Sequence, residues 1–475
     1  MITEIAWENV WRNKSRSLIV IAAVTVGVFA GVFSIAVMNS SIVQRIDAAV
    51  NEELAHIQVN NKEFRSSADI NNIIPRYNVV VSAMEKAPGM KDITGRIIVR
   101  GIASTSARSA GVEITGINVQ KEKEMFKLSE KLIPGTGTYF ESETKFNRAF
   151  IGEKLAKELN IIRYNLTTEA LSGLSAKGIP EIVISKLEPI HEQRFTSDKK
   201  FLKALEDLLT ESEYRKYSLP LIESAWSYRD GSRLILTFLD INNIQTGAAF
   251  RVSGIFRTNN DMFESTSVFV PETELRQLTG MQDNTYHRVI GMLEDNSLTE
   301  EASKKIREAL PDYEVLNWKE IQPDLAMMAD MMQQIYALFM VIILAALAFG
   351  IVNTMLMSVL ERTKEIGMLA AIGMNRRRIF LMIMLESVFL SIVGGISGMA
   401  VGGAVIAATA RKGINLVQYS EGLEAMGYSA HLFPAIDAQF FIITTILIVL
   451  TGIISSIYPA RKALKLNPVE AIRTE

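Results

Sequence analysis

Four long apolar runs divide the chain and restrict what it can fold into. They cover residues 17–38, 335–360, 379–410 and 438–460, and the second contains no charged residue. A helix rises about 1.5 Å per residue, so each run is long enough to cross about 30 Å of hydrocarbon. We therefore predict four transmembrane helices, because helices buried in soluble cores are rarely this long.

A segment of ordinary soluble composition, residues 39–334, separates the first two runs. Its short apolar stretches predict strands mixed with helices, and Ala149–Leu159 is predicted to be helical. The predicted fold class is an α-helical membrane protein with four transmembrane helices and a large α+β domain between the first and the second. Stalk helices should join this domain to both spans, and an inserted helical region is expected near residues 196–232.

Lysine and arginine are distributed unevenly over the short loops, and this predicts the orientation. Segments 1–16, 361–378 and 461–475 together carry 12 of them, whereas residues 411–437 carry 2. The positive-inside rule then places both termini and the loop 361–378 in the cytoplasm, with 39–334 and 411–437 in the periplasm. The predicted location is the cell inner membrane, in contact with its lipids.

Both ends of the chain are expected to form cytoplasmic helices. Residues 1–16 are predicted to form an interfacial helix with Trp7 and Trp11 at headgroup level. Residues 461–475 contain Asn467, Pro468 and Glu470, a pattern typical of a helix start.

The segment 361–378 reads ERTKEIGMLAAIGMNRRR. Ile366, Leu369, Ala370 and Gly373 follow one helical face, with charged residues at the start of the segment. A short amphipathic helix of this kind can dock into a groove on a soluble partner. The alternative is a basic anchor that only fixes the orientation of the two neighbouring spans.

No catalytic signature is recognisable in the chain. There is no G-x-x-x-x-G-K-[ST] phosphate loop, and the 4 histidines are far apart in the sequence. We therefore expect a non-enzyme that binds no metal and no cofactor of its own. The net charge of −2 gives no indication of a nucleic-acid partner.

The run NTMLMSVLERTKEIGMLAAIGMNRRRIF resembles the signature of FtsX-like ABC-transporter permeases, also called MacB-type, LolC/LolE-like or type VII. NVWRNKSRS near the start, PARKA and NPVEAI near the end, and Glu386 with Gly394-Gly395 fit the same family. The resemblance implies a dimeric permease, with a second copy or a paralogue, bound to two copies of an ABC ATPase that hold ATP and Mg. MacB itself carries a fused ATPase domain before the permease. This sequence starts directly with the predicted interfacial helix, so we expect the ATPase to be a separate subunit here.

The resemblance also implies that 362–374 is the coupling helix seated on the ATPase. The residues expected to make this coupling are Glu361, Arg362, Lys364, Glu365, Ile366, Gly367, Leu369 and Gly373.

An ionisable residue inside a predicted span is a functional hypothesis by default. Glu386 is such a residue, and the alternative is a structural role in which it pairs with Arg376–Arg378 or reaches towards the inner surface. Small residues suggest close helix contacts. Gly394, Gly398 and Gly402 are expected to pack within the subunit, whereas Gly27 and Gly31 are candidates for the dimer interface.

Methionines cluster just before the second span. Because methionine adapts to irregular apolar ligands, an acyl chain or a hydrophobic peptide is one hypothesis for what they contact, and ordinary stalk packing is the other. The residues concerned are Met327, Met328, Met331 and Met332.

Three functions remain open from the sequence. The first, which we favour because the ATPase is expected to be a separate subunit, is release or export of lipoproteins, driven by the motion of the ATPase. The second is MacB-like efflux of peptides, toxins or drugs. The third is an FtsX-like relay that transports nothing and regulates a periplasmic cell-wall hydrolase.

Overall fold

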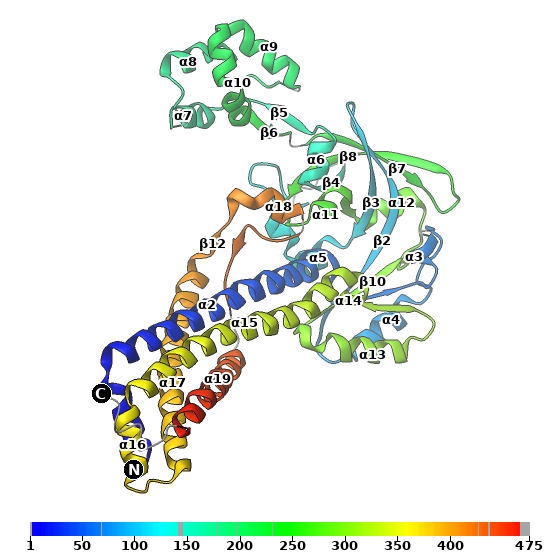
Figure 1. The fold of residues 1–475 in the computed structure, drawn as a ribbon. Helices are drawn as coiled ribbons and strands as arrows, with labels where there is room; N and C mark the ends of the chain where they lie inside the picture. The colour runs from blue at the N-terminus through cyan, green and yellow to red at the C-terminus, as the bar shows by residue number, and fades with distance from the viewer. Residues whose placement is uncertain are drawn as a thin grey trace. The chain divides into compact units, whose positions relative to one another are not determined.

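The computed structural model describes residues 2–67, 69–140, 146–176, 178–195, 197–229, 231–425, 427–435 and 438–465 (Figure 1). The chain divides into two compact units. The first contains Met1–Ile46, Pro323–Ser420 and Ser429–Glu475, and the second contains Asp47–Gln322 and Glu421–Tyr428. The predicted helix start at Asn467, Pro468 and Glu470 lies outside the described residues.

The first unit consists mainly of helices. They are α1 (Ile2–Arg12), α2 (Lys14–Ala48), α15 (Pro323–Glu361), α16 (Thr363–Ala371), α17 (Arg376–Lys412) and α19 (Ala438–Leu464). Among the described residues, α2, α15, α17 and α19 are long and apolar enough to cross a membrane. Each predicted span lies within one of these helices. Between α17 and α19 in the chain come two short strands that pair with each other, β12 (Ile414–Asn415) and β13 (His431–Leu432), and α18 (Ser420–Ala425), most of which belongs to the second unit.

Glycines allow α17 to approach α2 closely. A Cβ atom added at Gly394 would lie 2.7 Å from the Cβ of Val24, and one at Gly398 would lie 2.7 Å from the carbonyl oxygen of Thr25. At Gly402 the nearest atom would be a Cγ of Val32, at 3.4 Å. The expected packing within the subunit is therefore what the structure shows for these three glycines.

Gly27 and Gly31 face a different neighbour from the one expected. An added Cβ would lie 2.7 Å from Leu347 at Gly27 and 3.1 Å from Ile343 at Gly31, so both glycines face α15 of the same chain. This corrects their assignment to a dimer interface. Two glycines four residues apart mark a close helix contact, but the spacing does not say which helix makes it.

The second unit is built on a 9-stranded sheet with the order β11-β1-β10-β2-β3-β9-β4-β8-β7. Its strands are β1 (Ile57–Asn60), β2 (Met90–Ser104), β3 (Ser109–Ile117), β4 (Asn147–Gly152), β7 (Arg233–Leu239), β8 (Gln245–Phe256), β9 (Ser267–Pro271), β10 (Arg288–Leu293) and β11 (Glu314–Asn317). Pairs β3–β9 and β4–β8 are parallel, and the other pairs are antiparallel.

The long strand β2 belongs to two lobes of this unit. Its last residues pair with β7, so β2, β3, β9, β4, β8 and β7 close into a ring around one hydrophobic core. Its first residues pair with β10, where β11, β1 and β10 carry a second core together with α4 (Tyr77–Met84) and α13 (Thr299–Ala309). Short helices complete the unit: α3 (Phe64–Ser67), α5 (Val119–Met125), α6 (Glu153–Glu158), α11 (Asp261–Thr266), α12 (Glu272–Thr279) and α14 (Trp318–Ile321).

A helical insertion with its own core extends from the ring. It lies between β5 (Ile162–Tyr164) and β6 (Trp226–Tyr228), which pair with each other (Figure 1). Its helices are α7 (Thr168–Ala176), α8 (Glu181–Lys186), α9 (Asp198–Leu208) and α10 (Glu211–Ala225). The insertion therefore begins well before the predicted residue 196. Glycines and a proline around the short helices α7 and α8 hide their periodicity in the sequence.

The predicted helix at Ala149–Leu159 is only half correct. Residues Asn147–Gly152 form the buried strand β4, and the helix α6 begins at Glu153. A short apolar run inside a sheet has the same composition as a buried helix, so periodicity alone cannot distinguish them. Gly152 marks the change, since a Cβ atom there would lie 2.2 Å from the carbonyl oxygen of Glu264.

The two ends of the second unit's main segment meet at one carboxylate. A π-helical turn, Ala49–Leu54, follows α2 and contains Glu53. Glu53 Oε2 accepts hydrogen bonds from Asn260 Nδ2 at 2.8 Å and from Gln322 Nε2 at 3.4 Å. Beside it, β1 near the start of the unit pairs with β11 near the end of the segment.

Glu264 is expected to make the second unit less stable as the pH rises. Its side chain is 1% exposed, and Oε2 has no hydrogen-bond partner among the described residues. Burial, with the nearby Glu153 carboxylate, raises the pKa of Glu264 from 4.5 to about 7. The folded state then holds a proton that the unfolded state loses between these two values, so stability falls by roughly 3 kcal/mol over this range.

The variant Glu264→Gln tests this expectation. Its thermal unfolding midpoint should match that of the wild type near pH 4 and exceed it above pH 7, because the amide does not ionise. Unfolding curves of the full chain in detergent, measured at several pH values, give the comparison. Parallel pH profiles for the two proteins would contradict it.

Candidate coupling site

The loop between α15 and α17 folds into a short helix and a tight turn. One non-helical residue, Arg362, separates α15 from α16. Gly373 has a φ of +93°, a conformation that suits glycine, and it lies in the turn after α16. Asn375 then caps α17 by accepting a hydrogen bond from the backbone N–H of Arg377 at 2.9 Å. The helix at 363–371 is thus shorter than the predicted 362–374.

A buried ion pair connects this loop to α17. Arg362 Nη1 donates to both carboxylate oxygens of Glu386, at 2.9 and 3.1 Å. Glu386 is 5% exposed. The structural role expected for Glu386 is therefore supported, but its partner is Arg362 rather than Arg376–Arg378, which are exposed.

The N-terminal helix α1 joins the same network. Asn9 Nδ2 donates to Glu386 Oε1 at 2.7 Å, so this carboxylate has partners from both α1 and the loop. Arg12 forms an ion pair with Glu365 of α16. Trp7 packs edge-to-face on Phe389 of α17, with ring centroids 5.5 Å apart. Helix α1 is thus attached to α16 and α17 by both polar and apolar contacts.

Two members of the network, Arg362 and Glu365, keep their charges at neutral pH. Burial alone would lower the pKa of Arg362, but the carboxylates of Glu386 and Glu365 raise it above its ordinary value. The hydrogen bond from Arg12 lowers the pKa of Glu365, and Arg362 lowers it further. Because Arg362 and Glu365 both favour their charged forms, they hold an electrostatic link that does not titrate near pH 7.

A cavity of about 290 Å³ lies at the centre of these contacts. It is lined by α1, α2, α15 and the ion-paired residues, including Arg16, which bonds to Glu361 at the end of α15. Every charged side chain named here has an opposite charge beside it. The arrangement therefore suits mechanical linkage of helices better than catalysis or binding of a free ion.

The outward face of α16 is apolar with a basic residue. Met368 is 55% exposed, Ile372 in the turn after the helix is 79% exposed, and Lys364 and Ala371 are also exposed. The spacing 364, 368, 371, 372 places them on one side of a helix. Met368 and Ile372 were not among the residues predicted to contact the ATPase, although they lie four residues apart in the sequence.

The structure separates the residues predicted to contact the ATPase into two groups. Ile366 and Gly367 are buried against the other helices, Leu369 is partly buried, and Arg362 is held by Glu386. Glu361 and Glu365 bond to Arg16 and Arg12. Of the predicted set, Lys364 and Gly373 remain exposed without such a bond among the described residues. The helical face predicted to contact the ATPase is thus the face that packs against the other helices of the first unit.

The four methionines before the second span lie at the start of α15. Met327, Met328 and Met331 are exposed and Met332 is partly buried. The first unit therefore leaves this face of α15 largely uncovered, and stalk packing within the unit does not account for it. Their contact with a substrate stays a prediction.

The comparisons with known proteins concern this set of helices. Residues 337–468, which contain α16 and α17, match the family described as FtsX-like permease C-terminal. These residues form an FtsX-like permease domain. The match confirms the resemblance seen in the sequence, and the contacts described above tie the loop between α15 and α17 of the FtsX-like permease domain to α1.

Curated relatives of this chain include ABC transporters. A macrolide export ATP-binding/permease protein, MacB, of Bdellovibrio bacteriovorus is 36% identical over 163 residues, which is 34% of this chain and 22% of the relative. An uncharacterized ABC transporter permease of Methanocaldococcus jannaschii is 30% identical, over 48% of this chain and 55% of the relative. The permease YknZ of Bacillus subtilis is 27% identical, over 45% of this chain and 51% of the relative. The chain thus spans about half of these relatives' lengths or less.

One solved structure found by comparison is the extracellular domain of the noncanonic ABC-type transporter YknZ from Gram-positive bacteria. It has 12% sequence identity and a TM-score of 0.28, and covers 55% of this chain and 99% of that one.

Proposed function

We propose that this chain is the permease subunit of an ABC complex and transmits the movement of an ATPase to the helices of the first unit. The exposed face of α16 formed by Lys364, Met368, Ala371 and Ile372 carries the proposal. Arg362, just before this helix, forms the buried pair with Glu386 of α17, and Glu365 within the helix pairs with Arg12 of α1. An apolar helix face with a basic rim fits a groove on a soluble protein. The family of residues 337–468 supports the assignment.

The complex would contain two ATPase subunits, which hold ATP and Mg, and a second permease copy or a paralogue. The charge distribution of the loops supports an inner-membrane location with both termini cytoplasmic and the second unit outside. Hydrolysis in the ATPase would move α16, and the Arg362–Glu386 pair would carry this movement to α17.

The variant Ile372→Asp tests the proposed docking face. We expect it to lower the amount of ATPase that co-purifies with the chain by at least about tenfold, because a carboxylate would have to be desolvated in the contact. Its unfolding midpoint should stay close to that of the wild type, since the side chain is exposed. The measurement is quantitative pull-down of the ATPase encoded beside this permease, or identified by mass spectrometry of the native complex.

A matched control is Ile366→Asp on the inner side of the same helix. It should lower the stability of the chain itself, because Ile366 is 4% exposed. Full retention of the ATPase by a folded Ile372→Asp chain would exclude this face as the docking surface.

For the cargo, we propose export of amphipathic compounds. The name macrolide export recurs among the relatives and supports this choice. Release of lipoproteins and regulation of a cell-wall hydrolase stay predictions from the sequence resemblance. ATPase activity of the reconstituted complex, measured with a macrolide, a lipoprotein or a hydrolase added, distinguishes the three. Stimulation by a lipoprotein alone would reject the export of small compounds.

A further inference from the structure

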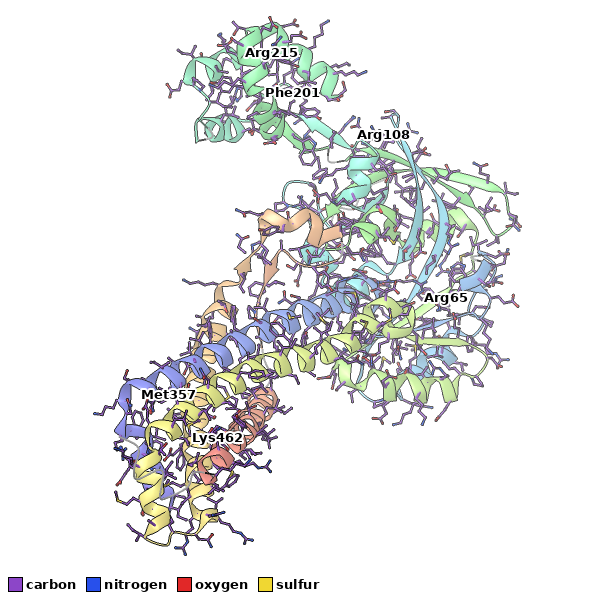
Figure 2. The ribbon with its side chains drawn as sticks, viewed as in Figure 1. Arg65, Arg108, Phe201, Arg215, Met357 and Lys462 are labelled. Carbon is purple, nitrogen blue, oxygen red and sulfur yellow. The ribbon has the colours of Figure 1, made fainter. Side chains whose placement is uncertain are left out.

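A small polar cavity in the second unit is lined by more positive than negative charge. Its volume is about 80 Å³. The charged and amide groups come from separate elements, with Asn60 on β1, Arg65 on α3, Arg100 on β2 and Arg288 on β10. Figure 2 labels Arg65 on this unit. One carboxylate, that of Glu113 on β3, also lines the cavity.

Strand register explains why these side chains meet. Arg288 is paired with Asn60 across β10 and β1, and Arg100 is paired with Glu113 across β2 and β3. Residues directly opposite each other on antiparallel strands point to the same face of the sheet. The strands of the sheet, and not a mobile loop, therefore place these side chains on a single face.

Two of the arginines have unused donors. Arg288 Nε donates to Asn60 Oδ1 at 3.2 Å, but within the part of the chain that the structure describes no carboxylate lies within ion-pair distance of Arg288 or Arg100. Arg65 has a distant partner, since its Nη1 lies 3.8 Å from Glu314. Arg96, the neighbour of Arg288 on β2, is neutralised by Glu122 at 2.7 Å. Around the cavity, three guanidinium groups, those of Arg65, Arg100 and Arg288, thus outnumber the two carboxylates of Glu113 and Glu314.

The walls of the cavity strengthen this positive field. Phe64, Ile98, Leu316 and Ile321 line it, and apolar walls reduce screening by water. Burial lowers the pKa of Arg288, and the charges of Arg96 and Arg65 lower it further, against the opposing effects of Glu113 and Glu314. A half-buried guanidinium with neighbouring positive charges is stabilised by an added anion.

We propose that this cavity binds a small oxyanion, a carboxylate or phosphate group, between Arg100 and Arg288. The guanidinium groups donate to the oxyanion, and the amide of Asn60 supplies a further donor. Planar guanidinium forks match the geometry of both groups. The small volume limits the occupant to the anionic group of a ligand, so the remainder of a larger ligand lies outside the cavity. This site does not depend on the ATPase or on the proposed function.

Calorimetric titration of the full chain in detergent tests the site, with inorganic phosphate and acetate as separate probes and chloride at equal ionic strength as the reference. We expect binding of at least one oxyanion above the chloride reference. Arg100→Gln and Arg288→Gln should each weaken it by roughly tenfold or more, because each loses a charge-assisted hydrogen bond. Preference for phosphate or for acetate identifies which class of group the cavity takes.

Three further variants keep the test independent of folding. Glu113→Gln should tighten binding, since it removes the opposing charge, and a misfolded protein would not show a gain. Arg288→Lys should retain part of the affinity. Arg108→Gln, at the exposed turn between β2 and β3 (Figure 2), should bind as the wild type does. Heats equal to those of chloride, or unchanged affinity in Arg100→Gln and Arg288→Gln, would overturn the proposal.

Discussion

Replacement of Arg362 by leucine is expected to destabilise the chain by about 3–5 kcal/mol, because it leaves the carboxylate of Glu386 buried without its cationic partner. The side chains of Arg362 and Glu386 are 16% and 6% exposed, so water cannot take over the lost contact. Asn9 alone would then hold the carboxylate. Chemical or thermal unfolding of the variant and the wild type in detergent micelles measures this loss of stability.

The double variant Arg362→Leu/Glu386→Leu should recover most of this stability. Replacement of both charges removes the buried ion as well as its partner, and such exchanges are often neutral or stabilising. Arg12→Leu is the matched control, because the side chains of Arg12 and Glu365 are 56% and 43% exposed and exposed pairs contribute at most about 1 kcal/mol. Equal losses of stability in Arg362→Leu and Arg12→Leu would show that the buried pair contributes no more to stability than the exposed pair.

Gly398→Ala should be the second strongly destabilising change, at about 1–3 kcal/mol. The added methyl group would lie 2.7 Å from the carbonyl oxygen of Thr25 and 2.8 Å from the Cβ of Val28. Neither a backbone oxygen nor a Cβ atom can rotate away, so α17 would have to move from α2. The unfolding midpoint and the yield of folded chain from membranes both report this loss.

Gly350→Ala provides the control within the same set of helices. An added Cβ there meets nothing within 4 Å among the described residues. Alanine has a higher helix propensity than glycine, so this change should leave the stability of the chain unchanged or raise it slightly. Similar losses at Gly350 and Gly398 would indicate that helix propensity, rather than contact with α2, determines the effect.

The membrane helices could be predicted from the sequence because their signal is local. An uninterrupted apolar run such as 335–360 requires a helix in lipid whatever its neighbours are. The contacts between helices could not be predicted in the same way. The partner of Glu386 is 24 positions away at Arg362, whereas Arg376–Arg378 are nearer in sequence and carry the same charge. Only the position of Arg362 beside α17 in the folded chain decides between them.

The face of α16 illustrates the same limit. Ile366 and Leu369 follow one stripe and Met368 and Ile372 follow another, and both stripes are apolar. An apolar stripe normally indicates the buried side, so periodicity selects an outer surface only when the other side is polar. The cavity beside Arg288 was equally hidden, because its residues come from strands far apart in the chain and meet through register.

The hydrogen bonds of Glu53 have a consequence for how this chain could have arisen. Asn260 and Gln322 hold the carboxylate that follows α2, while β1 and β11 pair at the same end, so the segment Asp47–Gln322 starts and finishes at neighbouring points. A segment with adjacent ends can be inserted into a helical hairpin, or exchanged for another, without displacing the helices on either side. The second unit is therefore modular: a relative with a different segment between the positions of Asp47 and Gln322 would have a new second unit and unaltered membrane helices.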